Sequence, residues 1–167
     1  MNSLKKNYKK SHILIVGSGI IGKFNALELS EQGFQITIAD PNENKNGSSA
    51  SLGLLIGHMY QKSKGRSWEL RKKSNELWPK WIKFFRQYNK NLNIEKPLIQ
   101  LTTDQTYFEK LSKFVCHHPE RDLKILEKES TIIKNINKIF NIKNLRGIIS
   151  FQDGRINPIS LLKTINI

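Results

Sequence analysis

The chain has 167 residues, of which 38% are hydrophobic and 25% charged. These values are typical of a folded protein of about one domain and exclude an intrinsically disordered chain. The formal net charge is +14, but the basic residues are dispersed and no nucleic-acid-binding motif accompanies them, so we interpret the charge as a solvated surface. The single cysteine, Cys116, excludes an internal disulfide and a cysteine-based metal cluster.

Residues 1–10 are polar and basic, and we predict that they form a disordered arm. The apolar residues that follow are interrupted by glycines and lack a small-residue cleavage site. No stretch reaches the roughly 18 apolar residues that a membrane-spanning helix needs. We therefore expect a cytoplasmic protein without a signal peptide or a transmembrane segment.

A strand, a helix and a second strand are predicted in succession after this arm. Residues 12–16 form a short apolar, β-branched run of the kind that is buried on both faces of a parallel sheet. Residues 20–32 have helical spacing and are followed by Gly33, and residues 34–39 form a second strand that Pro41 ends. The sequence therefore predicts a βαβ unit.

A glycine-rich turn, Gly17-Ser18-Gly19-Ile20-Ile21-Gly22, joins the first strand to the helix and has the pattern G-x-G-x-x-G. Gly17 permits the tight turn, Gly19 lets the backbone approach a pyrophosphate, and Gly22 lets the helix and strand pack closely. The free N–H groups and the dipole of the helix favour an anion at this place. Asp40 ends the second strand, where a carboxylate accepts hydrogen bonds from ribose hydroxyls and disfavours the 2′-phosphate of NADP. Together these features predict a dinucleotide site.

Further helices and strands are predicted along the rest of the chain, separated by segments without a clear pattern. They are a long helix over 66–88 that Pro79 kinks or restarts, a strand over 97–102, a helix over 104–116, a strand over 148–156 broken by a turn at Asp153-Gly154, and a helix over 159–165 that Asn157-Pro158 initiates. The pattern between 117 and 147 does not determine a structure.

The segment that follows the second strand contains small hydroxyl residues and glycines, Asn46-Gly47-Ser48-Ser49-Ala50-Ser51-Leu52-Gly53-Leu54-Leu55. It resembles the second flavin motif of the D-amino-acid oxidase and glycine oxidase family, the DAO family. Residues 68–85 resemble the long helix that follows in that family, and residues 153–162 resemble its G-x-V-D/N-P-x-x-L element. The resemblance covers the chain from His12 onward.

The resemblance implies an FAD cofactor and assigns a role to each part of the motifs. The residues implied to hold the pyrophosphate are Gly17, Ser18, Gly19, Ile20 and Gly22. Asp40 is implied to hold the adenosine ribose, Ser48, Ser49, Ala50 and Ser51 to lie near the pyrophosphate, and Leu54 and Leu55 to lie near the flavin ring. Members of the family oxidise a carbon–nitrogen bond by moving hydride from the substrate α-carbon to flavin N5, with a small amine or amino acid as substrate.

The predicted fold class is α/β, a Rossmann-like FAD-binding βαβ unit with the beginning of an α+β substrate domain. The predicted divisions are the disordered arm at 1–10, the βαβ unit and flavin loop at 11–63, a partial substrate region at 64–147 and a return segment at 148–167. Because chains of this family are about twice as long, the resemblance implies a truncated member: a gene fragment, a degenerate reading frame, or one half of a split enzyme whose complementary chain supplies the rest. Independent activity of such a chain is not expected. A sheet without its later strands is expected to expose edges and apolar faces.

No catalytic residue is assigned. His58 and Tyr60 follow the flavin segment but are interpreted as structural residues, and Arg121, Arg146 and Arg155 match no motif for a substrate carboxylate. The group Cys116, His117 and His118 lacks metal-ligand spacing, and the tryptophans Trp68, Trp78 and Trp81 are interpreted as packing residues. Two alternatives remain open: a fragment of an NAD-dependent dehydrogenase, and a non-catalytic basic module that binds nucleic acid or membrane.

Overall fold

The computed structural model describes residues 11–41, 47–62 and 64–165, so the predicted disordered arm at 1–10 lies outside the described residues. The chain divides into two compact units. Unit 1 consists of residues 1–53, 84–92 and 157–167, and unit 2 consists of residues 54–83 and 93–156. None of the helices in the described part of the chain is both long and apolar enough to cross a membrane.

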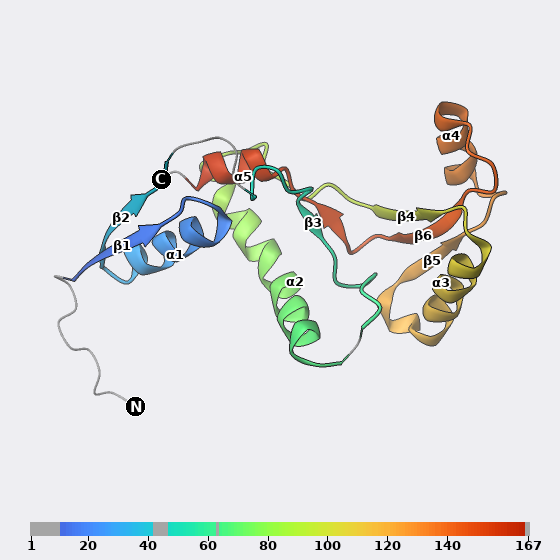
Figure 1. Ribbon diagram of the computed structural model, residues 1–167, viewed down its shortest axis with the longest axis horizontal. Helices are drawn as coiled ribbons and strands as arrows, with labels where there is room; N and C mark the ends of the chain where they lie inside the picture. The colour runs from blue at the N-terminus through green and yellow to red at the C-terminus, as the bar shows by residue number, and fades with distance from the viewer. Residues whose placement is uncertain (1–10, 42–46, 63, 166–167) are drawn as a thin grey trace. The chain divides into compact units, whose positions relative to one another are not determined.

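Unit 1 contains the predicted βαβ unit. Strand β1 (His12–Val16) pairs in parallel with β2 (Gln35–Ala39), in continuous register, and helix α1 (Ile20–Glu31) connects them (Figure 1). Gly33 follows the helix with φ +88°, a conformation that glycine adopts without the steric cost of a side chain. The strand–helix–strand prediction is confirmed, with boundaries within one residue of those expected.

The prediction that β1 is buried on both faces is wrong. Leu14 is 61% exposed and Val16 is 81% exposed. Ile15 points to the α1 side, since its Cγ2 lies 3.4 Å from the position of a Cβ built on Gly22, and side chains alternate along a strand. Within unit 1, α1 thus covers the Ile15 face of the two-stranded sheet, and the Leu14 face is exposed in the described part of the chain.

A short helix from the end of the chain completes unit 1. Helix α5 (Pro158–Thr164) begins after Asn157, whose side chain accepts a hydrogen bond from the Ser160 amide at 3.0 Å. This N-cap and the proline in the first turn are the signals from which the helix was predicted. Leu161 and Leu162 are buried in unit 1, as is Phe85, whose ring meets Phe24 of α1 edge to face.

The long predicted helix is α2 (Arg66–Phe85), most of which belongs to unit 2. It continues without interruption through Pro79, so of the two predicted effects the helix does not restart there, and the predicted kink stays a prediction. A proline removes one backbone hydrogen bond, and the flanking turns of this 20-residue helix remain helical. Its three tryptophans are half-buried.

Unit 2 is built on an antiparallel sheet with the strand order β4 (Leu98–Thr102), β6 (Arg146–Ser150), β5 (Leu123–Leu126) (Figure 1). Helix α3 (Gln105–His117) contributes Leu111 to a core cluster with Ile148, and helix α4 (Thr131–Phe140) contributes Ile133 to a second cluster with Ile149. Because neighbouring residues of a strand face opposite sides, the two helices pack on the two sides of β6.

Both helices of this sheet begin at a capping side chain. Asp104 accepts a hydrogen bond from the Tyr107 amide at 2.8 Å, and Ser130 caps α4 through the Ile133 amide. Strand β5, helix α4 and the short 3-10 helix η2 (Pro119–Arg121) lie in the interval for which the sequence pattern determined no structure.

The two-residue strands β3 (Leu54–Leu55) and β7 (Gly154–Arg155) pair in antiparallel fashion. The predicted turn at Asp153-Gly154 is therefore wrong in one respect, because Gly154 already belongs to β7 and the break in the strand lies at residues 151–153. Gly154 is required by packing, since a Cβ built on it would lie 2.6 Å from the Glu95 carbonyl oxygen.

Candidate functional site

The glycine-rich turn leaves β1 and enters α1 as predicted. The Gly17 amide donates to the Ala39 carbonyl at 2.8 Å, which extends the β1–β2 ladder by one bond, and Gly17 has φ +103°. A Cβ on Gly22 would lie 2.0 Å from the Gly17 carbonyl oxygen, well inside contact distance. Gly17 therefore permits the turn and Gly22 permits the close packing of helix on strand, as the motif analysis expected.

Asp40 lies against this turn. Its Oδ2 accepts a hydrogen bond from the Ser18 amide at 2.6 Å. The carboxylate predicted to hold a ribose is thus brought to the phosphate-binding turn, and its contact there is with backbone. Its role toward a ribose stays a prediction.

Ser48 also reaches the turn from a separate segment. Its Oγ accepts a hydrogen bond from the Ile20 amide at 2.9 Å, and a Cβ built on Gly19 would lie 3.1 Å from the same oxygen. Ser51 Oγ donates to the Ser48 carbonyl at 2.9 Å, which holds the 48–51 turn together. An anion that binds at the start of α1 must therefore share the Ile20 amide with the Ser48 hydroxyl or displace it.

Three of the predicted segments thus come together in unit 1: the Gly17–Gly22 turn, Asp40 and the Ser48–Ser51 turn. Leu54 and Leu55, predicted to lie near a flavin ring, form β3 of unit 2. Their relation to a flavin stays a prediction.

Lys23 is a buried cation of α1 that the motif analysis did not single out. The side chain is 8% exposed, and its Nζ donates to the Leu162 carbonyl of α5 at 2.9 Å. Burial lowers the pKa of the Lys23 ammonium, and the negative charge of Asp40 acts in the opposite direction. Lys23 thus links α1 to α5 and adds a positive charge on the side of the unit where Asp40 lies.

Replacement of Lys23 by methionine is expected to change how stability depends on pH. Between the lowered pKa of Lys23 and its ordinary value of 10.5, the unfolded chain binds more protons than the folded one. In this range Lys23 therefore makes the free energy of unfolding of the wild type increase as the pH rises. The K23M variant loses that gain. The melting temperatures of both proteins are measured from pH 8 to pH 10.5. The difference between the two curves reports Lys23, because the titration of all other groups contributes equally to both.

The matched control is K110M, which removes an exposed lysine of α3. The melting temperature of K110M should follow the wild-type pH profile. If the K23M and wild-type curves run parallel across the whole range, Lys23 does not titrate differently in the folded state.

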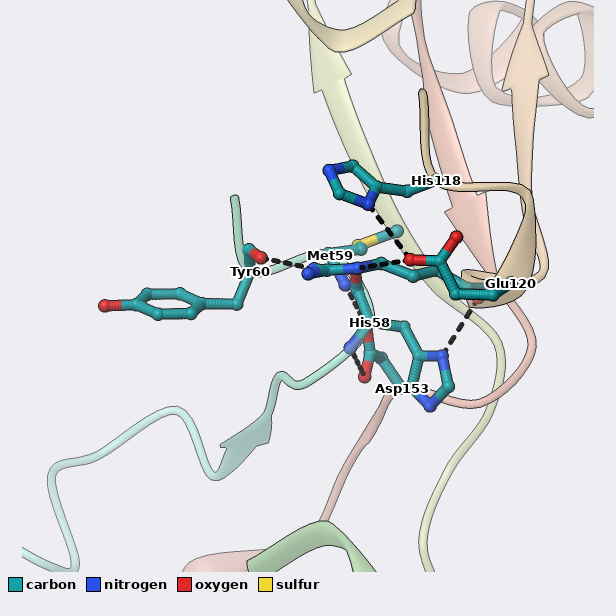
Figure 2. A network of polar contacts seen from close by, with 7 residues as sticks. His58, Met59, Tyr60, His118, Glu120 and Asp153 are labelled. Carbon is teal, nitrogen blue, oxygen red and sulfur yellow. Dashed lines mark hydrogen bonds and ion pairs between the residues drawn. The ribbon is translucent and has the colours of Figure 1, made fainter. Parts of the chain in front are cut away.

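A second polar cluster lies in unit 2 and surrounds residues 57–60, the segment that follows β3. Asp153 is 1% exposed, and its Oδ1 accepts hydrogen bonds from the amides of Gly57 and His58 at 2.8 and 2.9 Å. Its Oδ2 accepts a third from Met59 at 2.7 Å. Figure 2 shows Asp153 beside this stretch of backbone. One buried carboxylate therefore satisfies three consecutive amides.

Arg121 binds the carbonyl groups of the same segment. Its Nη1 donates to the carbonyl oxygens of His58 and Tyr60 at 3.2 and 2.6 Å, and its guanidinium lies 4.5 Å from the centre of the Trp68 ring. Burial lowers the pKa of Arg121, and the carboxylates of Glu120 and Asp153 oppose that shift. Within residues 57–60, the amides of 57–59 thus bond to a buried carboxylate, and the carbonyls of His58 and Tyr60 bond to a buried guanidinium.

His58 and Tyr60 have structural contacts, in keeping with their interpretation from the sequence. His58 Nδ1 donates to the Arg121 carbonyl at 2.9 Å, because a carbonyl oxygen only accepts (Figure 2). The Tyr60 ring lies under the Arg71 guanidinium at 4.1 Å. Sequence reasoning missed that Arg121 and Asp153 bind the same backbone segment, and no local signal identified it, since two strands and a helix (β5, α4 and β6) separate the two residues along the chain.

The other two arginines considered for a substrate carboxylate are paired within unit 2. Arg155 Nη1 lies 2.9 Å from Glu95 Oε2, and Arg146 Nε lies 3.8 Å from Glu127 Oε2. Among the described residues, no three His, Cys, Asp or Glu side chains are grouped so as to hold a metal ion.

Comparison with known proteins identifies the family. A family model described as "FAD dependent oxidoreductase", DAO, matches residues 12–165. No curated protein sequence matches the chain.

Solved structures share the fold. Glycine oxidase from Geobacillus kaustophilus superposes with a TM-score of 0.72 at 21% identity, over 93% of this chain and 43% of that chain. Glycine oxidase from Bacillus cereus gives 0.71 at 18% identity, over 93% and 42%. Iminodiacetate oxidase from Chelativorans sp. BNC1 gives 0.70 at 20% identity, over 91% and 42%.

The chain thus spans about two fifths of the length of these structures. The match over 12–165 covers nearly the whole described chain and confirms the predicted α/β fold class and the resemblance seen in the glycine-rich segments. On this evidence the chain belongs to the DAO family of FAD-dependent oxidoreductases.

Proposed function

We propose that unit 1 binds FAD through the turn at the start of α1, and that the chain forms the cofactor-binding part of an oxidase of amines or amino acids. The observation that carries the proposal is the convergence of the Gly17–Gly22 turn, Asp40 and Ser48. Family membership and the printed names of the similar structures, glycine oxidase and iminodiacetate oxidase, support the same reading.

The residues present fit the diphosphate of this cofactor. The turn has no side chain at Gly17, Gly19 or Gly22, so backbone amides can approach a phosphate directly. Ser48 already places a hydroxyl oxygen on the Ile20 amide, a position at which a phosphate oxygen accepts the same bond. The hydroxyl retains a proton that it can donate to the phosphate. In this proposal Asp40, whose carboxylate lies against the turn, accepts hydrogen bonds from the ribose.

In this proposal Ser49, Ala50 and Ser51 line the cofactor near its diphosphate, and Leu54 and Leu55 lie beside its ring. When bound, the flavin supplies the hydride acceptor for oxidation of the substrate carbon–nitrogen bond. The chain's own contribution is to bind the cofactor and to fix its orientation. The substrate is proposed to be a small amine or amino acid.

We also propose that a complementary polypeptide supplies further residues for substrate oxidation. The exposed apolar side chains Leu14 and Val16 on one face of the β1–β2 sheet support this proposal, because a parallel sheet is ordinarily covered on both faces.

FAD titration of the purified full chain tests the cofactor proposal. We expect quenching or a spectral shift of the flavin on binding, and no comparable binding of NAD⁺. Asp40→Asn is expected to weaken FAD binding by about tenfold or more, because hydrogen bonds to a charged group contribute about 1.5–3 kcal/mol. The exposed Glu31→Gln, at the end of α1, is the matched control and should bind as the wild type does.

Several outcomes would contradict the proposal. Binding of NAD⁺ in preference to FAD would assign the turn to a dehydrogenase, and binding of nucleic acid that weakens steeply with salt, without FAD binding, would favour the basic module. Anaerobic addition of glycine or a primary amine to the FAD complex tests whether a complementary polypeptide is needed. If the chain alone reduces its bound FAD, seen as loss of the absorption bands of oxidised flavin, no complementary polypeptide is required.

A further inference from the structure

A cavity lies in unit 2, on the side of the sheet where β4 and α3 meet the segment after β3. Its volume is about 640 Å³, within the range of small-molecule sites. Its apolar wall includes Leu54, Met59 and Leu98, and Tyr107 and Gln100 line it as polar groups. The cavity therefore has an apolar body with a few polar groups, which is the usual composition of a ligand site.

The Tyr107 hydroxyl is held by two side-chain amides. Gln100 Nε2 donates to it at 2.8 Å and Gln61 Nε2 donates to it at 3.3 Å. A tyrosine hydroxyl has one proton to donate, and here both of its recorded bonds use it as an acceptor. No residue in the described part of the chain accepts a hydrogen bond from it. Tyr107 thus presents an oriented donor in a cavity whose other walls are mainly apolar.

The charge around the cavity favours an anion as the acceptor. Lys62 lines the cavity, and no Asp or Glu is among the described residues that line it. A hydrogen bond from a hydroxyl to a carboxylate is stronger than one to a neutral oxygen. The complementary ligand has an apolar body and one carboxylate group.

We propose that this cavity binds an amphipathic carboxylate, with Tyr107 donating a hydrogen bond to the carboxylate and Lys62 providing the nearby positive charge. An amino acid with an apolar side chain belongs to this class of ligand. That the ligand is the substrate of the oxidation rests on the proposed function, whereas binding of the carboxylate does not require FAD.

The test uses hexanoate as the probe and 1-hexanol as its neutral counterpart, each titrated into the full chain without FAD. Binding is followed by the side-chain amide NMR signals of Gln61 and Gln100. We expect hexanoate to bind at least about tenfold more tightly than hexanol, because the pair differs in the negative charge that Tyr107 and Lys62 recognise.

Tyr107→Phe removes only the hydroxyl and is expected to weaken hexanoate binding by about tenfold or more and hexanol binding by much less. A residue with a purely structural role would weaken both ligands equally. Tyr88→Phe is the matched control, because Tyr88 is 54% exposed and belongs to unit 1. Its affinity for both ligands should equal that of the wild type.

Three results would overturn the inference: hexanoate binding no tighter than hexanol binding, an unchanged hexanoate affinity in Y107F, or an equal loss for both ligands. The FAD titration is a separate measurement. If hexanoate binds and FAD does not, the proposed function fails and the carboxylate site stands. If FAD binds and hexanoate does not, the carboxylate site fails and the proposed function stands.

Discussion

Replacement of Gly22 by alanine is expected to lower the free energy of unfolding of unit 1 by about 2 kcal/mol and to weaken FAD binding more than tenfold. The new Cβ would lie 2.0 Å from the Gly17 carbonyl oxygen and 3.1 Å from its carbon, both backbone atoms that cannot rotate away. Alanine is favoured over glycine in a helix by about 1 kcal/mol. The strain of overpacking, about 1–3 kcal/mol or more, exceeds that gain and displaces the turn.

Gly47→Ala is the matched control for this substitution. A Cβ built on Gly47 has no heavy atom within 4 Å. The free energy of unfolding of the G47A variant should therefore differ from that of the wild type by no more than about 0.5 kcal/mol. Denaturant unfolding followed by near-ultraviolet signals, together with FAD titration of both variants, measures the effect. Equal FAD affinity in G22A and the wild type would mean that the turn does not contact the cofactor.

Replacement of Asp153 by asparagine should release the 57–60 segment. Asparagine retains one acceptor oxygen but places an amide donor group near three backbone amides that now bond to the carboxylate. Loss of these charge-assisted bonds at a site 1% exposed is expected to cost about 3 kcal/mol. The amides of Gly57, His58 and Met59 should then exchange with solvent roughly a hundredfold faster, since each factor of ten corresponds to about 1.4 kcal/mol.

Hydrogen exchange measured residue by residue reports this effect directly and does not require the whole chain to unfold in one step. Asp122→Asn is the matched control, because Asp122 is exposed, neighbours Arg121 and has φ +51°, a conformation that asparagine adopts readily. It should leave exchange at 57–59 unchanged. Unaltered protection in D153N would show that Asp153 does not hold the segment.

The βαβ unit was predictable because its signals are local. The run His12–Val16, the three glycines of the turn and Pro41 lie within about 30 residues, and each signal acts through backbone geometry of its own neighbourhood. The Asn157 cap and Pro158 predicted α5 for the same reason. The proximity of Asp40 to the turn follows from parallel pairing, because β1 and β2 end at the same edge of their sheet.

The interval 117–147 was not predictable from the pattern. Strand β5 has four residues, and its pairing with β6 is made to a partner more than 20 residues further along the chain. The exposure of Leu14 and Val16 was also misjudged, because an apolar strand does not reveal whether anything covers its second face.

By itself the sequence determined the phosphate-binding turn, the order of the first strands and helix, and the family, since these depend on short-range spacing and on glycine positions. Only the tertiary structure decided that Ser48 bonds the Ile20 amide, that Asp153 and Arg121 hold residues 57–60 from two sides, and that two glutamines orient Tyr107. The physical reason is that such hydrogen bonds need atoms placed within about 3 Å. For segments up to 96 residues apart, that placement is set by the packed backbone rather than by local spacing.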